Sequence, residues 1–200
     1  MLPIMANNST VQAISAAMLL LSSASAGAQE NLNPINPLPG VKTWNWSDSG
    51  ISVRLTQIIP EQVRGFYMGR GFSQDDAELI AGDCIFQTVI RNDSPANKVE
   101  MDMKQWQVAS GAKTGRPKLR EDWGEIWRQR NSPAPAQLAF RWALFPTVQE
   151  FEHGDWNMGM SSYGLPPGTR FDLRFSFVAA GTTRSGEIRD IECAKDTIPE

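Results

Sequence analysis

The chain has 200 residues, with 19 basic and 22 acidic side chains and a formal net charge of −3. This balance argues against a nucleic-acid-binding protein, for which a basic face is expected. No charged residue precedes Glu30, so the sequence divides into an uncharged leader and a remainder long enough for one domain.

The leader has the features of a secretory signal. Its apolar run, Val11–Leu21, is too short to span a bilayer, which needs about 20 apolar residues. Small residues follow, with Ala-x-Ala patterns that allow cleavage after Ala26 or after Ala28. The segment before the apolar run departs from the pattern, because it contains no Lys or Arg. We expect residues 1–28 to be a cleaved signal peptide, a periplasmic or secreted location, and no membrane span after cleavage.

The two cysteines, Cys84 and Cys193, both follow the leader. An even number of cysteines in an exported protein predicts a disulfide bond. The alternative, a pair of thiolate metal ligands, usually has closely spaced cysteines, and these two are 109 positions apart.

Residues 29–43 are predicted to form an extended lead-in, because they begin with a stretch of three prolines and three asparagines without periodicity. Residues 44–200 are then predicted to form one domain. Alternating apolar and polar residues predict strands in this domain. The alternation occurs at residues 51–59, 84–91, 99–104, 138–144, 171–177 and 188–193.

Two segments have helical signals instead. Ser73 precedes Asp75 and Asp76, acids that favour the first turn of a helix extending to Ala81. Residues 120–130 place Trp123 and Trp127 at helical spacing. Many strands and two short helices predict an all-β fold, a single antiparallel immunoglobulin-like β-sandwich with two short helices.

The sequence offers little for catalysis. His153 is the single histidine, and neither Ser161 nor Ser162 stands in the nucleophile-elbow motif of a serine hydrolase. The motif Gly69-Arg70-Gly71 lacks the third glycine of a dinucleotide-binding loop. We therefore expect no catalytic residues and no enzyme activity.

Methionines suggest a metal site. Met158 and Met160 form a Met-x-Met pair in a predicted loop, five residues after His153. Thioether and imidazole groups are suitable Cu(I) ligands, so these three residues are candidate copper ligands. Met101 and Met103 form a second candidate pair, although their alternation with charged residues also fits a role in the core.

Tryptophans suggest a different function. Trp44 and Trp46 would share one face of an extended segment, and Trp156 lies in a predicted loop. These three are candidate recognition aromatics, and packing against a sheet edge is the alternative for Trp44 and Trp46. The other tryptophans are predicted to lie in the core, namely Trp106, Trp123, Trp127 and Trp142.

These observations predict a periplasmic or secreted binding or accessory protein. One hypothesis is Cu(I) handling through His153, Met158 and Met160, with copper as the cofactor and a copper protein or another exported protein as the partner. The alternative is an aromatic-faced module without a metal that recognises a glycan or a protein. Neither hypothesis involves nucleic acid.

Overall fold

The computed structural model describes residues 40–95 and 98–196. The predicted signal peptide and residues 29–39 of the predicted lead-in lie outside this part. The described residues form β1 (Thr43–Asp48), β2 (Ile51–Gln57), α1 (Pro60–Met68), α2 (Gln74–Ala81), β3 (Ile85–Asn92), β4 (Lys98–Asp102), the 3₁₀ turn η1 (Met103–Gln105), β5 (Gln107–Ser110), β6 (Lys113–Gly115), α3 (Arg120–Gln129), α4 (Ala134–Ala143), β7 (Val148–Glu152), β8 (Trp156–Ser162), β9 (Arg170–Ala179) and β10 (Thr182–Glu192).

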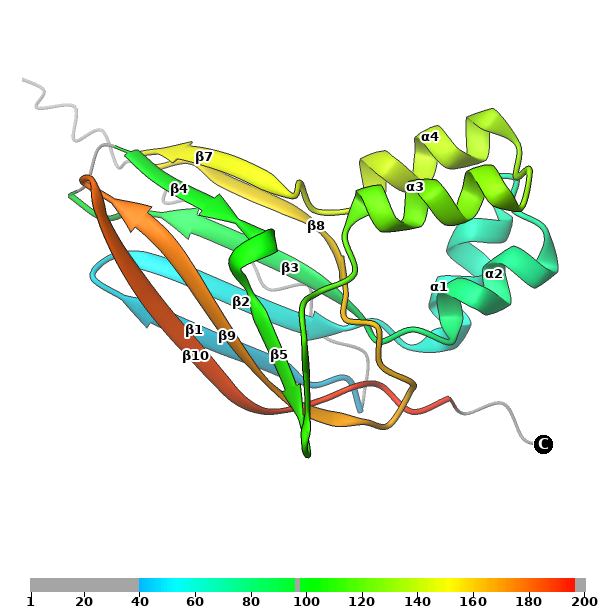
Figure 1. Cartoon of the computed structure of the whole chain (residues 1–200), viewed down its shortest axis with the longest axis horizontal. Coiled ribbons are helices and arrows are strands. Elements are labelled where there is room, and N and C mark those ends of the chain that lie inside the picture. The colour runs from blue at the N-terminus through cyan, green and yellow to red at the C-terminus, as the bar shows by residue number, and fades with distance from the viewer. Residues whose placement is uncertain (1–39, 96–97, 197–200) are drawn as a thin grey trace, which may run out of the picture. The chain divides into compact units, whose positions relative to one another are not determined.

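The strands form two antiparallel sheets. In sheet A the order is β1-β2-β3-β8. In sheet B the order is β6-β5-β9-β4-β7, and β10 pairs with β9. Figure 1 shows the strands of sheet B drawn across those of sheet A. The predicted predominance of antiparallel β-structure is confirmed, whereas the immunoglobulin-like subtype is not shown.

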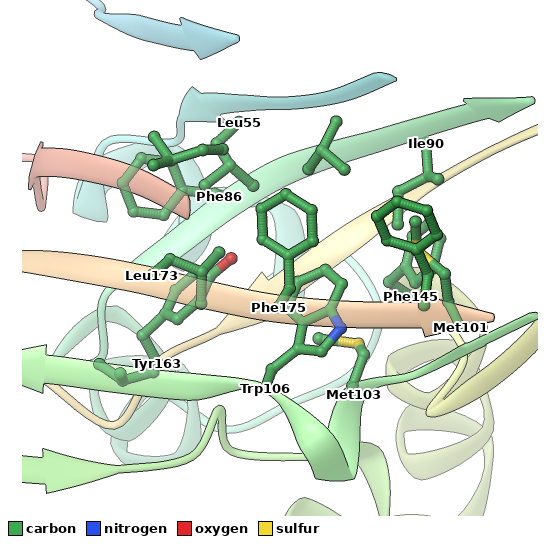
Figure 2. Packing of buried hydrophobic residues seen from close by; sticks show 14 of the residues in the cluster. Leu55, Phe86, Ile90, Met101, Met103, Trp106, Phe145, Tyr163, Leu173 and Phe175 are labelled. Atoms are coloured by element: carbon green, nitrogen blue, oxygen red, sulfur yellow. The ribbon is translucent and has the colours of Figure 1, made fainter. Parts of the chain in front are cut away.

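Both sheets contribute to one apolar core. Sheet A supplies alternate residues such as Val53, Leu55 and Phe86, and sheet B supplies Leu173 and Phe175. Figure 2 shows Leu55, Phe86, Leu173 and Phe175 in this cluster. Because side chains alternate across a strand, burying one face of each sheet leaves the other face outward. The alternation in the sequence therefore marks which residues are outward.

The predicted disulfide is confirmed between Cys84 and Cys193. Cys84 directly precedes β3 and Cys193 directly follows β10, so the bond joins the two sheets at one end. Such a bond is consistent with an oxidising compartment. None of the helices in the described ranges is both long and apolar enough to cross a membrane.

The prediction of two short helices is wrong, because the described residues contain four. The two predicted ones are present as α2 and α3. Helix α2 begins after Ser73, whose side chain accepts a hydrogen bond from the backbone N–H of Asp76 at 3.1 Å. Helix α1 begins at Pro60, a residue whose fixed φ suits the first turn.

The predicted strand at residues 138–144 is also wrong, because these residues belong mostly to α4. Ala136, Phe140 and Leu144 are buried at a spacing of four, which is the helical period. Small alanines on both sides made the apolar residues appear to alternate. Consequently Trp142, predicted to lie in the core, is 79% exposed.

The helices are two insertions, one between β2 and β3 and one between β6 and β7, and they gather at one end of the sheets (Figure 1). They share a second apolar cluster, which includes Tyr67, Trp123, Trp127 and Phe140. The rings of Trp123 and Trp127 stack with their centroids 5.1 Å apart. The apolar core between the sheets and the apolar cluster of the helices are therefore neighbours in space, and strand β8 lies between them.

Candidate functional site

The candidate copper ligands lie on or near β8. His153 is in the turn between β7 and β8, and its Nδ1 atom is 2.8 Å from the carbonyl oxygen of Ser94. Met158 and Met160 are in β8, which corrects the predicted loop. Met160 accepts a hydrogen bond from the hydroxyl of Tyr67 in α1, with an O–S distance of 3.3 Å. Burial raises the pKa of Tyr67, so its hydroxyl remains a donor at neutral pH.

These ligands are spread along β8 and its turn. Met160 is paired with Gln87 near the start of β3, whereas His153 contacts the loop that follows Asn92 at the end of β3. Five strand residues between these points correspond to about 17 Å. Met158 and Met160 thus share a face of β8, and the structure does not bring His153 to them.

The second methionine pair is buried. Met101 is 2% exposed and Met103 is 4% exposed, and both belong to the core between the sheets. Figure 2 shows the two side chains among the aromatic residues of that core. Within residues 40–95 and 98–196, no cluster of three or more His, Cys, Asp or Glu side chains could hold a metal ion.

The candidate recognition tryptophans differ in exposure. Trp44 and Trp46 are partly buried, Trp44 against Phe86 and Trp46 against Phe175. Trp156 is 45% exposed at the start of β8. Of the three, Trp156 is therefore the most exposed to solvent.

Trp156 stands on the outer face of sheet A, and the strand register defines its surroundings. It is paired with Arg91 of β3, and Met158, which is 47% exposed, is paired with Val89. The next strand places Arg54 beside Val89. Exposed tryptophan, exposed methionine and two arginines are thus neighbours on one face.

Among the residues that the structure describes, no outward strand position of this face is Asp or Glu. The face consists of the alternate outward residues of four strands, which are Thr43, Asn45, Ser47, Ser52, Arg54, Thr56, Gln87, Val89, Arg91, Trp156, Met158 and Met160. The Nε atom of Arg54 donates to Asn45, and that of Arg91 donates to Asp93, which lies beyond the end of β3. Hydroxyl, amide and apolar groups make up the rest.

The outer face of sheet B is different. Lys98 forms ion pairs with Glu100 and Glu150 across β4 and β7. On β9 and β10, Glu187 forms ion pairs with Arg174 and Arg189. Sheet B therefore presents a conventional charged surface to water, and the low charge of the outer face of sheet A is a local property.

The insertion α3–α4 fixes the position of β8. The backbone N–H of Phe145 donates to the carbonyl oxygen of Met160 at 2.7 Å. Gly159 permits this approach, because a Cβ atom there would lie 2.6 Å from the backbone nitrogen of Phe145. The exposed Trp142 is two residues before Leu144, which forms a bridge with Met160. The edge of β8 is thus covered at Met160, while Trp156 and Met158 remain exposed.

The sequence indicated Trp156 as a candidate recognition residue. It did not indicate the neighbours of Trp156 in sheet A, because they are far from it in the sequence. Comparison of the chain with family models, with curated proteins and with solved structures found no match.

Proposed function

We propose that this chain is an exported recognition module with a β-sandwich fold that binds a partner protein through the outer face of sheet A. The observation that carries the proposal is the exposed pair Trp156 and Met158 on a face whose described outward strand positions include no Asp or Glu. Residues two apart on a strand lie about 7 Å from one another, so the indole and the thioether form one apolar patch.

The composition of this face supports a protein partner. Interfaces between proteins are enriched in aromatic residues, Met and Arg, and they are depleted in Lys, Glu and Asp. The outer face of sheet A follows this pattern, with two arginines as its charged residues. Tryptophan and arginine, which are neighbours here, are also among the residue types enriched in energetic hot spots.

The chemistry of the partner follows from the patch. An apolar centre would cover Trp156 and Met158, and the flexible thioether would adapt to its shape. Arg54 and Arg91 use Nε for contacts within the chain, so their terminal guanidinium groups would donate to carbonyl or carboxylate oxygens of the partner. Export is supported by the confirmed disulfide and by the predicted signal peptide.

Site-specific photocrosslinking in the producing cell tests this proposal. A benzophenone amino acid replaces Met158 in one variant and Arg184 on β10 in a control variant. We expect a single defined adduct from position 158 and no adduct from position 184. The absence of an adduct at 158, or the same adduct from both positions, would contradict the proposal.

The crosslinked partner is then purified for a binding measurement. Replacing Trp156 with alanine should raise the dissociation constant at least about tenfold, because truncating a hot-spot tryptophan typically costs about 2 kcal/mol or more of binding free energy. The matched control is Arg184→Ala, which should leave the dissociation constant unchanged. Equal affinities of the Trp156→Ala variant and the wild type would rule out this face.

Cu(I) handling is the second candidate function, because the thioethers of Met158 and Met160 project from the same face of β8 and that of Met158 is exposed. His153 would have to leave the carbonyl of Ser94 to join them. An anaerobic titration against a chromogenic Cu(I) chelator tests it. Loss of a stoichiometric complex in Met158→Leu supports the candidate, and the same affinity in wild type and variant opposes it.

A further inference from the structure

A polar pocket lies at the β1 edge of sheet A, opposite the β8 edge that carries Trp156, where β1, the start of β9 and the end of β10 meet. Its volume is about 400 Å³, within the range of small-ligand sites. Its walls are Lys42, Thr43, Trp44, Arg170, Asp190 and Glu192. The residues of the proposed protein-binding patch, Trp156 and Met158, take no part in it.

An irregularity in β10 shapes this pocket. Between Ile188 and Ile191, β10 has one residue more than β9, which is a β-bulge. Within the bulge, Asp190 has a φ of 53°, a left-handed conformation that is uncommon outside glycine. The bulge directs the carbonyl oxygen of Asp190 to the indole N–H of Trp44, at 3.2 Å. Such local strain is concentrated at functional sites in proteins.

The charged walls of the pocket are linked by ion pairs. Lys42 is 2.7 Å from Glu192, and Arg170 contacts Glu192 at 3.2 Å and Asp190 at 2.7 Å. Gln57 also anchors this end of β10, because its side chain donates to the carbonyl oxygen of Glu192 at 2.7 Å. Two cations and two carboxylates therefore alternate around the pocket, and their charges sum to zero.

This arrangement indicates the chemistry of the ligand. An ionic ligand would have to displace one of the existing ion pairs, which gives it no electrostatic advantage. Hydroxyl groups both donate and accept, so a ligand with several hydroxyls would bond to the carboxylates and to the cations without separating them. Trp44 also lines the pocket, where the exposed part of its ring would contact C–H groups of the sugar. We propose that this pocket binds a neutral saccharide.

The charge state of Glu192 fits a binding role. A glycosidase needs one carboxyl group that keeps a proton to donate to the leaving oxygen. Here hydrogen bonding to Lys42 lowers the pKa of Glu192, and the charge of Arg170 acts in the same direction. Glu192 is therefore ionised at neutral pH and serves as a hydrogen-bond acceptor.

Saturation-transfer NMR on the full mature chain tests the inference. The probes are the neutral disaccharides maltose, cellobiose and diacetylchitobiose, with galacturonate and glucosamine as charged controls. We expect transfer to at least one neutral disaccharide and none to the charged sugars. No transfer at millimolar concentration, or transfer only to a charged sugar, would overturn the inference.

Two variants assign the binding to this pocket. Lys42→Met removes an exposed cation, and Trp44→Phe reduces the aromatic surface while keeping an aromatic ring against Phe86. Each should weaken the disaccharide dissociation constant by about tenfold, the effect of losing one charge-assisted hydrogen bond or a comparable stacking contact. Lys113→Met, on β6, is the matched control and should bind as wild type does. Unchanged affinity in both pocket variants, measured on samples with wild-type unfolding midpoints, would place the saccharide elsewhere and overturn the inference.

Discussion

The ammonium group of Lys118 lies over the indole ring of Trp123, with Nζ 3.5 Å from the ring centroid. The same Nζ atom is 3.6 Å from a carboxylate oxygen of Asp83. Asp83 is buried directly before the disulfide residue Cys84, and its other oxygen accepts the backbone N–H of Gly164 at 2.8 Å. Lys118 therefore connects the apolar cluster of the helices to the end of the sheets where the disulfide lies.

The pH dependence of the unfolding free energy should reveal the raised pKa of Asp83. Burial raises the pKa of Asp83, and the charge of Lys118 together with the N–H of Gly164 opposes this only in part. An acid with a raised pKa in the folded state binds its proton more tightly there than in the unfolded chain. Its contribution to stability is therefore present below the unfolded pKa of about 3.9 and is lost as the pH rises through the folded pKa.

The variant Asp83→Asn keeps the shape of the side chain and cannot titrate. We expect the free energy of unfolding of the wild type, relative to this variant, to fall as the pH rises above about 4, by at most about 1.4 kcal/mol per pH unit. Urea unfolding of both proteins across the acid range measures it. A relative stability that rises with pH would show that Lys118 outweighs burial.

Removing the disulfide should destabilise the protein strongly. Cys84 and Cys193 are separated by 109 residues, and closing so long a loop restricts the unfolded chain. We expect the double variant Cys84→Ala/Cys193→Ala to lose about 5 kcal/mol of unfolding free energy in the chain-entropy model. Denaturant unfolding gives the value, and a loss below about 1 kcal/mol would mean that other contacts hold the two ends together.

Gly159→Ala should separate β8 from the α3–α4 insertion. The new methyl group would lie 2.6 Å from the backbone of Phe145, so either strand or loop must shift. We expect a loss of about 1–3 kcal/mol, typical of overpacking. Gly115→Ala in β6 is the control, because its Cβ would meet nothing within 4 Å. Equal unfolding free energies of the two variants would show that the approach of Phe145 is dispensable.

Replacing each of two tryptophans of the α3–α4 insertion with alanine should change the stability by very different amounts. Trp127 is 1% exposed, and replacing it with alanine should cost about 3–5 kcal/mol. Trp142 is largely exposed on α4, and its replacement by alanine should change the stability by less than about 0.5 kcal/mol. Thermal unfolding compares them, and a large loss for Trp142→Ala would reveal a packing role.

Local patterns predicted much of the fold. Strands such as β2 and β9 alternate apolar and polar residues, and the disulfide followed from an even number of cysteines. Helix α4 was missed because the same apolar residues fit two periods. The prolines at 133 and 135, which favour a helix start, were the discriminating signal.

The candidate site was harder to predict because it depends on strand order. Trp156 was singled out from its local sequence, but Gly154 and Gly159 suggested a loop around it. Gly159 is instead a strand residue that makes room for Phe145, a contact between residues 14 positions apart. The run of described outward strand positions without Asp or Glu on sheet A forms only when β1, β2, β3 and β8 are placed side by side, which no local pattern encodes.

The disulfide also gives the molecule a covalent ring. Every peptide bond between Cys84 and Cys193 lies within that ring, whereas β1, β2, α1 and α2 precede it. A protease that cuts after the exposed Lys113, at the start of β6, would open the ring and leave a single molecule under non-reducing conditions. The fragment that carries β1, β2 and β3 would stay bonded through the disulfide to the fragment that carries β8, so a nicked chain keeps all four strands of sheet A in one molecule.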